Sequence, residues 1–176
     1  IWTNRGTDKL VIPATDLVFV GFGIHAPEYG WDDYKDIDVK GKIVIAMVND
    51  PGFYDDSLFR GRNMTYYGRW TYKHEEAERQ GAAGVLVLHN KAAASYGWEV
   101  CQSSHVQKNI ALCDETLNAQ AIGMKGWLAE EACRRIFEAC GEDFEAALAA
   151  AKRPGFKSFV LPAKSKVELT IQKEVG

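Results

Sequence analysis

Two apolar segments separated by a helical pattern limit the folds open to this chain. Lys42 to Val48 and Val85 to Leu88 are short apolar runs of the kind found in strands buried on both faces. The residues from Arg69 to Gln80, which lie between them, repeat at helical spacing. Parallel strands require a long connection, which is usually a helix and is right-handed. The sequence therefore predicts a parallel strand–helix–strand crossover and an α/β fold.

The predicted helix has two faces of different character. Four residues share the face that we expect to be buried: Trp70, His74, Ala77 and Gly81. Three glutamates share the face that we expect to be exposed: Glu75, Glu76 and Glu78. Gly81 is also the expected end of the helix, because glycine readily takes the left-handed conformation of a C-terminal cap.

Further elements are predicted before and after this unit. Strands are expected near residues 17–24, 121–124 and 167–175, the first with a bend or bulge at its glycines. Helices are expected from Leu128 to Cys140 and from Asp143 to Lys152, the second capped by its first residue. We expect the strands to form a barrel-like or sandwich-like β core, with the helices packed outside.

Length and composition are typical of one globular domain. The 176 residues fit a single domain with its core over about 17–175, and no internal repeat or linker divides them. A net charge of -3 and a pI near 5.8 give no basic surface for nucleic acid. No apolar run reaches the roughly 18 to 20 residues that cross a membrane. The first residue, Ile1 rather than Met, leads us to expect a processed or trimmed piece of a longer chain.

Motifs for catalysis or cofactor binding are incomplete. Gly21 to Ala26 has the spacing of a dinucleotide-binding loop, but Pro27 and a turn-rich segment replace the helix that would receive the pyrophosphate. His74 begins a zincin-like pattern, yet Glu78 occupies the position of the second histidine. No Gly-x-Ser-x-Gly nucleophile motif occurs. We therefore expect no catalytic residue, no metal ligand and no cofactor in this chain.

Clustered aspartates and four cysteines are interpreted as structural features. The loop aspartates lack the glycine and glutamate offsets of an EF-hand, so we expect solvated carboxylates rather than calcium ligands. Cys133 and Cys140 lie seven residues apart on a predicted helix and are expected to pack as small apolar groups. The sequence leaves open whether Cys101 and Cys113 form a disulfide.

Long motifs across the chain resemble a known domain family. The segments GFGIHAPEYGWDDYKDIDVKGKIVIAMVNDPGF (21–53) and FRGRNMTYYGRWTYKHEEAERQGAAGVLVLHN (59–90) are similar to the protease-associated (PA) domain inserted in bacterial aminopeptidase Y-like zinc peptidases. SYGWEV (95–100) and GWLAEEACRRIFEACGEDFEAAL (126–148) continue the resemblance, which covers about residues 17–175.

The resemblance implies a specific architecture and an accessory role. It implies a PA-type swivelling β/β/α domain, with a β-sandwich or open-barrel core and flanking helices, that spans residues 1–176 as a fragment of a larger peptidase. In that family two zinc ions are bound by a separate catalytic domain, so zinc is expected there and not in this chain. The implied partners are that catalytic domain and a peptide substrate, and the implied location is periplasmic or extracellular. A stand-alone peptide-binding or protein-binding module is the alternative, and a self-sufficient hydrolase is a further one.

The segment from Phe59 to Lys73 combines arginine with aromatic residues. Guanidinium groups bind carboxylates in a forked geometry, and aromatic rings supply rigid contact area. Five residues are candidates for contact with a peptide or with the catalytic domain: Arg60, Arg62, Tyr66, Tyr67 and Arg69. The alternative interpretation is that Tyr67 and Trp70 belong to the core and that the arginines form local salt bridges.

Overall fold

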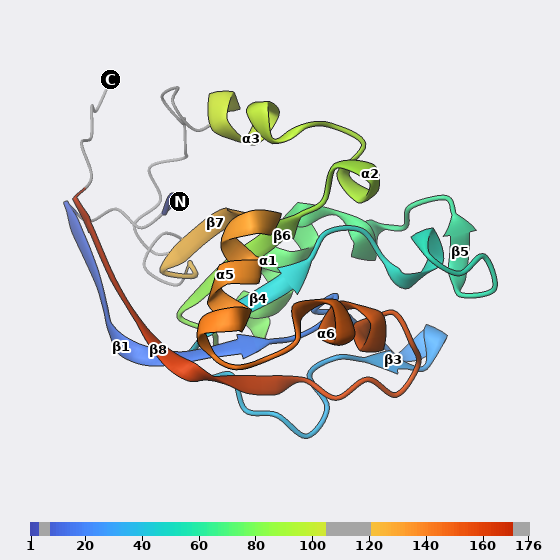
Figure 1. Cartoon of the computed structure of the whole chain (residues 1–176), viewed down its shortest axis with the longest axis horizontal. Coiled ribbons are helices and arrows are strands. Elements are labelled where there is room, and N and C mark those ends of the chain that lie inside the picture. The colour runs from blue at the N-terminus through green and yellow to red at the C-terminus, as the bar shows by residue number, and fades with distance from the viewer. Residues whose placement is uncertain (4–7, 105–120, 171–176) are drawn as a thin grey trace.

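The computed structural model describes residues 1–3, 8–104 and 121–170, and these form a mixed α/β fold around a five-stranded sheet (Figure 1). The strand order is β7-β6-β4-β1-β8. The strands of this sheet are β1 (Lys9–Phe19), β4 (Ile43–Met47), β6 (Gly84–His89), β7 (Met124–Ala129) and β8 (Phe159–Thr170). The remaining strands are short: β2 (His25–Ala26) and β3 (Trp31–Asp32), which form a hairpin, and β5 (Phe59–Arg62).

Five α-helices and three 3-10 helices accompany these strands in the described residues. The α-helices are α1 (Trp70–Arg79), α2 (Lys91–Ala94), α3 (Trp98–Ser104), α5 (Glu130–Ala139) and α6 (Phe144–Ala151). The 3-10 helices are η1 (Pro27–Tyr29), η2 (Pro51–Phe53) and η3 (Tyr66–Gly68).

The strand pairing confirms the predicted crossover. Ile43 of β4 lies beside Leu17 of β1 and Gly84 of β6, and all three strands run parallel, as does β7 beyond them. Helix α1 connects β4 to β6, so the strand–helix–strand order expected from the sequence is present. The described strands form one main sheet, whose curvature arises where the β1–β8 ribbon bends away from the other strands (Figure 1).

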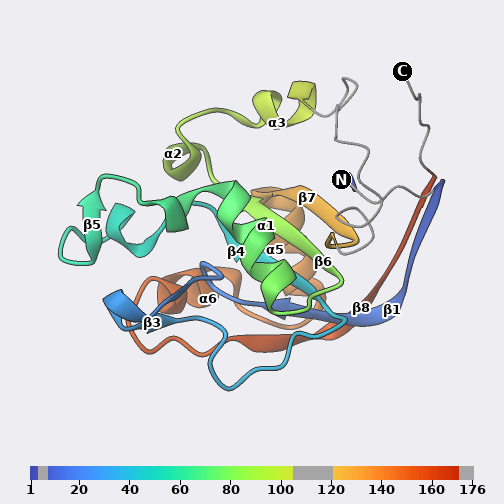
Figure 2. The same ribbon diagram turned by 180° about the vertical axis from the view of Figure 1, so that it is seen from behind.

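Both faces of the sheet are buried, each beneath different helices. In β4, Ile43 and Ile45 face one cluster of buried apolar residues while Val44 and Ala46 face the other. The first cluster includes residues of α5 and α6, and the second includes Ala77 of α1 and residues of α2. Figures 1 and 2 show α5 and α6 on one side of the sheet and α1 on the opposite side. Burial on both faces explains why the central strands are continuous apolar runs.

Strands β1 and β8 form a long antiparallel ribbon at one edge of the sheet. Phe19 lies opposite Phe159 near the middle of the fold, and Lys9 lies opposite Thr170 at the far end. The register shifts between Ile12 and Thr15, where the ribbon contains a bulge. The strand expected over 167–175 is longer at its start, because β8 begins at Phe159. Residues 171–175 of that prediction lie outside the described residues.

Most predicted helix boundaries are confirmed within two residues. Helix α1 covers Trp70–Arg79 and is followed by Gly81 with φ of +76°. The Asp143 side chain caps α6 by accepting a hydrogen bond from the Ala146 N–H. The expected strand over 121–124 is displaced, because β7 runs from Met124 to Ala129 and α5 starts directly after it.

The predicted faces of α1 are partly wrong. Glu76 was expected to be exposed but is only 4% exposed, and Trp70 was expected to be buried but is 40% exposed. Tyr72 and Lys73 are buried as well. The apolar pattern failed here because polar side chains with internal partners fill the interior positions of this helix.

We predict that Phe137→Ala lowers the free energy of unfolding by about 3–5 kcal/mol, because it removes a fully buried ring from α5. The ring makes edge contacts with Phe19 and Phe144 at centroid distances of 5.3 and 5.4 Å. Urea denaturation measures the change. Glu138→Ala, one position along on the exposed side of α5, serves as the control, and equal stability of the two variants would contradict the packing described.

Candidate recognition surface

The loop from Phe59 to Gly68 contacts the β2–β3 hairpin through an aromatic cluster. The Tyr29 ring of η1 stacks on Phe59 with centroids 4.5 Å apart. The Tyr67 hydroxyl donates a hydrogen bond of 2.5 Å to the Glu28 carboxylate, and this bond raises the pKa of Tyr67 to about 12. Tyr67 also packs edge-on against Tyr29 and Phe59. Two segments far apart in the sequence therefore build one surface.

The five predicted contact residues occupy different environments on this surface. Arg60, Arg62 and Arg69 are exposed, and of these only Arg62 has an ion-pair partner among the described residues, Asp56 at 3.7 Å. Tyr66 is 57% exposed, and its hydroxyl lies 2.7 Å from Glu75 of α1. The Arg62–Asp56 and Tyr66–Glu75 contacts both involve exposed side chains, and such contacts contribute little to stability.

Neither interpretation of this loop drawn from the sequence holds for all of its residues. Tyr67 is half-buried against other rings, which agrees with a structural role, whereas Trp70 is not a core residue. Arg60 and Arg69 form no salt bridge within the described part of the chain, contrary to the local salt bridges of the structural interpretation. The loop thus has a fixed aromatic base and exposed cationic side chains.

Asn49 and Asp50 fasten this loop to the end of β4. The Asp50 carboxylate is fully buried and accepts hydrogen bonds from the Thr65 N–H at 2.8 Å and the Thr65 hydroxyl at 2.6 Å. Its other oxygen caps η2 by accepting from the Gly52 N–H. Asn49 adopts φ of +71°, its N–H donates to the Gly68 carbonyl, and its side-chain amide donates to the Ala93 carbonyl. The C-terminal part of the loop, at Thr65 and Gly68, is therefore held by these two residues.

Lys73 of α1 joins this anchor to the core. Its side chain is 0% exposed, and its ammonium donates to the carbonyl oxygens of Asn49 at 2.9 Å and Tyr67 at 2.6 Å. Burial lowers the pKa of Lys73 to about 7, although the carboxylates of Asp33 and Asp50 favour its charged form. A buried ammonium requires such partners, because an unpaired charge in the interior is costly.

Asp33 is a further buried acidic residue of this region. Its carboxylate accepts hydrogen bonds from the Ile24 N–H at 3.0 Å and the Trp31 indole N–H at 2.8 Å. Burial raises the pKa of Asp33 to about 7, and these hydrogen bonds together with Lys73 oppose that rise. The Ser158 hydroxyl donates to the Asp33 carbonyl, which ties the segment before β8 to the same point. Asp33 thus fixes the β2–β3 hairpin on which the aromatic cluster rests.

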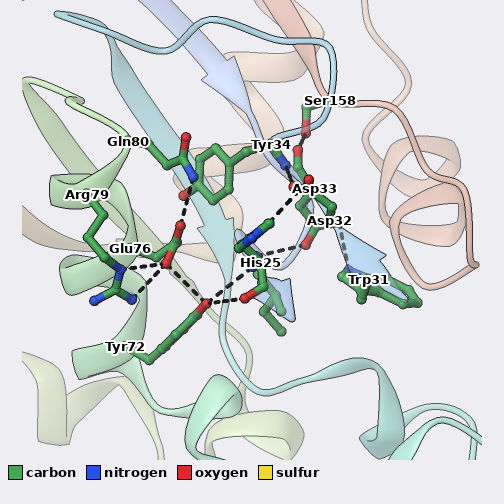
Figure 3. A network of polar contacts seen from close by, with 11 residues as sticks. His25, Trp31, Asp32, Asp33, Tyr34, Tyr72, Glu76, Arg79, Gln80 and Ser158 are labelled. Carbon is green, nitrogen blue, oxygen red and sulfur yellow. Dashed lines mark hydrogen bonds and ion pairs between the residues drawn. The ribbon is translucent and has the colours of Figure 1, made fainter. Parts of the chain in front are cut away.

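Figure 3 shows a neighbouring polar network that links α1 to the hairpin. Glu76 accepts hydrogen bonds from the Arg79 guanidinium at 2.8 Å and the Gln80 amide at 2.8 Å. The Tyr72 hydroxyl lies 3.3 Å from Glu76 and within 3.2 Å of the backbone N–H and carbonyl of His25. The exposed His25 imidazole lies 3.2 Å from Asp32. These contacts explain why Glu76 and Tyr72 are buried on a helix whose sequence suggested an acidic outer face.

The remaining sequence motifs take structural roles where they are described. Gly21 and Gly23 adopt left-handed φ values of +54° and +61° and lead into β2 and the short η1, so no α-helix follows them directly. His74 packs between the rings of Trp2 and Trp70. No group of three or more metal-ligating side chains is found in the described residues, and no helix there is long and apolar enough to cross a membrane.

The two cysteine predictions have different outcomes. Cys133 is fully buried, and burial raises the pKa of its thiol to about 12, in keeping with an apolar packing role. Cys140 is partly buried. Cys101 is buried in α3, whereas Cys113 lies outside the described residues, so their pairing stays untested.

Comparison of the chain with protein-family models, curated proteins and solved structures finds no match. The geometry of the surface and the resemblance carried by the sequence motifs are therefore the basis for a functional proposal.

We predict that Lys73→Met lowers the free energy of unfolding by about 3–5 kcal/mol, because it leaves buried carboxylates without their cation and two carbonyl oxygens without a donor. Amide exchange of Thr65–Gly68 should become faster. Urea denaturation and hydrogen exchange measure the two effects. The exposed Lys35→Met is the matched control, and a Lys73→Met protein as stable as this control would disprove the anchoring role.

Proposed function

We propose that this chain is a non-catalytic protease-associated domain of an exported zinc aminopeptidase, and that its Phe59–Arg69 surface contacts a peptide substrate or the catalytic domain. The main support is a set of exposed arginine and tyrosine side chains held on a buried, hydrogen-bonded anchor. Loops that carry recognition residues commonly rest on a rigid scaffold of this kind. Arg60 and Arg69, which lack ion-pair partners among the described residues, are suited to bind carboxylates.

The mixed α/β fold with flanking helices is consistent with the proposed PA-type architecture. Its curved, open sheet agrees better with an open-barrel core than with two facing sheets. Inserting a domain into a host protein requires that the chain leave and return at neighbouring points. The β1–β8 ribbon supports such an insertion by placing Lys9 opposite Thr170, although Trp2 pairs with Lys125 of β7 at the other edge of the sheet. In this proposal the zinc ions and the catalytic residues belong to the host peptidase domain.

We predict that this chain alone does not hydrolyse aminoacyl chromogenic substrates in the presence of zinc. The assay compares the isolated chain with the full-length peptidase at equal concentration, with and without a chelator. Turnover by the isolated chain that the chelator abolishes would favour a self-sufficient hydrolase and disprove the accessory role. Peptide binding by the isolated chain without turnover would agree with recognition by this domain itself.

In the full-length enzyme, Arg60→Ala combined with Arg69→Ala should raise KM for peptides by at least about tenfold and leave kcat nearly unchanged. The reason is that a hydrogen bond to a charged group contributes about 1.5–3 kcal/mol to binding. Steady-state kinetics over several peptides measure the effect, and zinc content should not change.

Arg62→Ala is the matched control for this experiment. Arg62 lies on β5 with Arg60, but its guanidinium pairs with Asp56. Its KM should change less than that of the double variant. Unchanged kinetics of the double variant across all peptides would rule out a recognition role for this loop and leave it as a structural element.

A further inference from the structure

A hollow that is distinct from the Phe59–Arg69 surface lies at the carboxyl ends of the parallel strands. A partly enclosed cavity of about 130 Å³ is floored by apolar side chains from the ends of β4 and β6 and from α6, among them Met47, Leu88 and Leu148. It adjoins a shallower hollow beside α2, and Asn90 and Glu130 line both. Ligands of open α/β sheets bind outside the carboxyl ends of the strands.

One wall of the cavity carries a cation without a carboxylate partner. Lys152, which follows α6, holds its ammonium 4.4 Å from the centre of the Tyr54 ring. None of the ion pairs among the described residues includes Lys152. The Tyr54 ring is partly buried, and this burial, followed by the charge of Glu130, raises its pKa. Lys152 is therefore positioned by an aromatic ring and remains able to bind an anion.

The other wall carries a carboxylate that is oriented but only weakly neutralised. Glu130, the first residue of α5, accepts a hydrogen bond of 2.9 Å from the Asn90 amide. Its second oxygen lies 3.9 Å from Arg134. The Arg134 guanidinium is engaged at 2.5 Å with Glu145, a second carboxylate that lines the cavity and that this ion pair neutralises. The Glu130 side chain is 42% exposed, so its carboxylate is accessible to a ligand.

We infer that this cavity binds a free α-amino acid with an aliphatic side chain, whose carboxylate contacts Lys152 and whose ammonium contacts Glu130. A ligand with both charges matches walls of opposite charge, whereas an anion alone would meet Glu130 and a cation alone would meet Lys152. The apolar floor suits an aliphatic side chain. The volume suits a small ligand, since a cavity of about 150 Å³ accommodates benzene and pockets for drug-sized ligands begin near about 300 Å³.

This inference goes beyond the proposed function and does not depend on it. If the chain belongs to an aminopeptidase, the ligand is of the class that the enzyme releases as product, and the site would sense product near the catalytic domain. Binding can be measured on the chain alone, so its failure would leave the peptide-recognition proposal intact.

The test is calorimetric titration of the purified chain with L-leucine, leucinamide and N-acetylleucine. We expect saturable binding of leucine with Kd of about 1 mM or lower. Leucinamide, which lacks the carboxylate, and N-acetylleucine, which lacks the ammonium, should each bind at least about tenfold more weakly. Absence of saturable leucine binding, or equal affinity for the three compounds, would overturn the inference.

Two variants assign the two charges separately. Lys152→Met should weaken leucine binding at least about tenfold and remove the preference for leucine over leucinamide. Glu130→Gln should remove the preference for leucine over N-acetylleucine. Lys157→Met and Glu131→Gln, which change neighbouring exposed charges, are the matched controls. Variants that fold normally but keep both preferences would place the ligand elsewhere.

Discussion

The buried ammonium of Lys73 is the interaction on which the arrangement of the loops depends. It donates to the carbonyl oxygens of Asn49, at the end of β4, and of Tyr67, near the C-terminal end of the Phe59–Gly68 loop. Asp33, whose charge favours the ammonium form, fixes the β2–β3 hairpin that meets the same loop through its rings. A charge in the interior is stable only with several partners, so this one residue constrains three segments at once.

The two ends of the parallel strands have different roles. At the amino ends the connections are tight, as where the Gly41 N–H donates to the Gly81 carbonyl. At the carboxyl ends, polar side chains come within three residues of the strands: Asn49 and Asp50 after β4, Asn90 after β6 and Glu130 after β7. Each of these is held by hydrogen bonds. Both proposed binding regions depend on residues from this edge, where loops can vary while the sheet stays intact.

The sequence predicted those parts of the fold that follow from apolar periodicity. The crossover from β4 through α1 to β6 and the helices α5 and α6 were identified within a few residues, because their buried positions repeat regularly. The faces of α1 were not predicted correctly. Lys73 is buried because it binds Asn49, which is distant in the sequence, and Glu76 is buried beside Tyr72 of the same helix. The arginine and tyrosine loop was located from composition alone. The Lys152–Glu130 cavity left no local signal, because its walls come from four separate segments.

The β1–β8 ribbon also determines how the domain responds to force. Its two strands run antiparallel, with Lys9 opposite Thr170 at the outer end, and their hydrogen bonds lie perpendicular to the strands. Tension applied through both outer ends would therefore load these bonds one after another, as in opening a zipper, rather than all together in shear. The ribbon would open from its outer end, whereas tension on the first residues of the chain would also load β7, to which Trp2 is paired through Lys125. If this chain is inserted in a host protein, as proposed above, relative movement of the host would act first on the outer end of the ribbon and on the Trp2–Lys125 pairing.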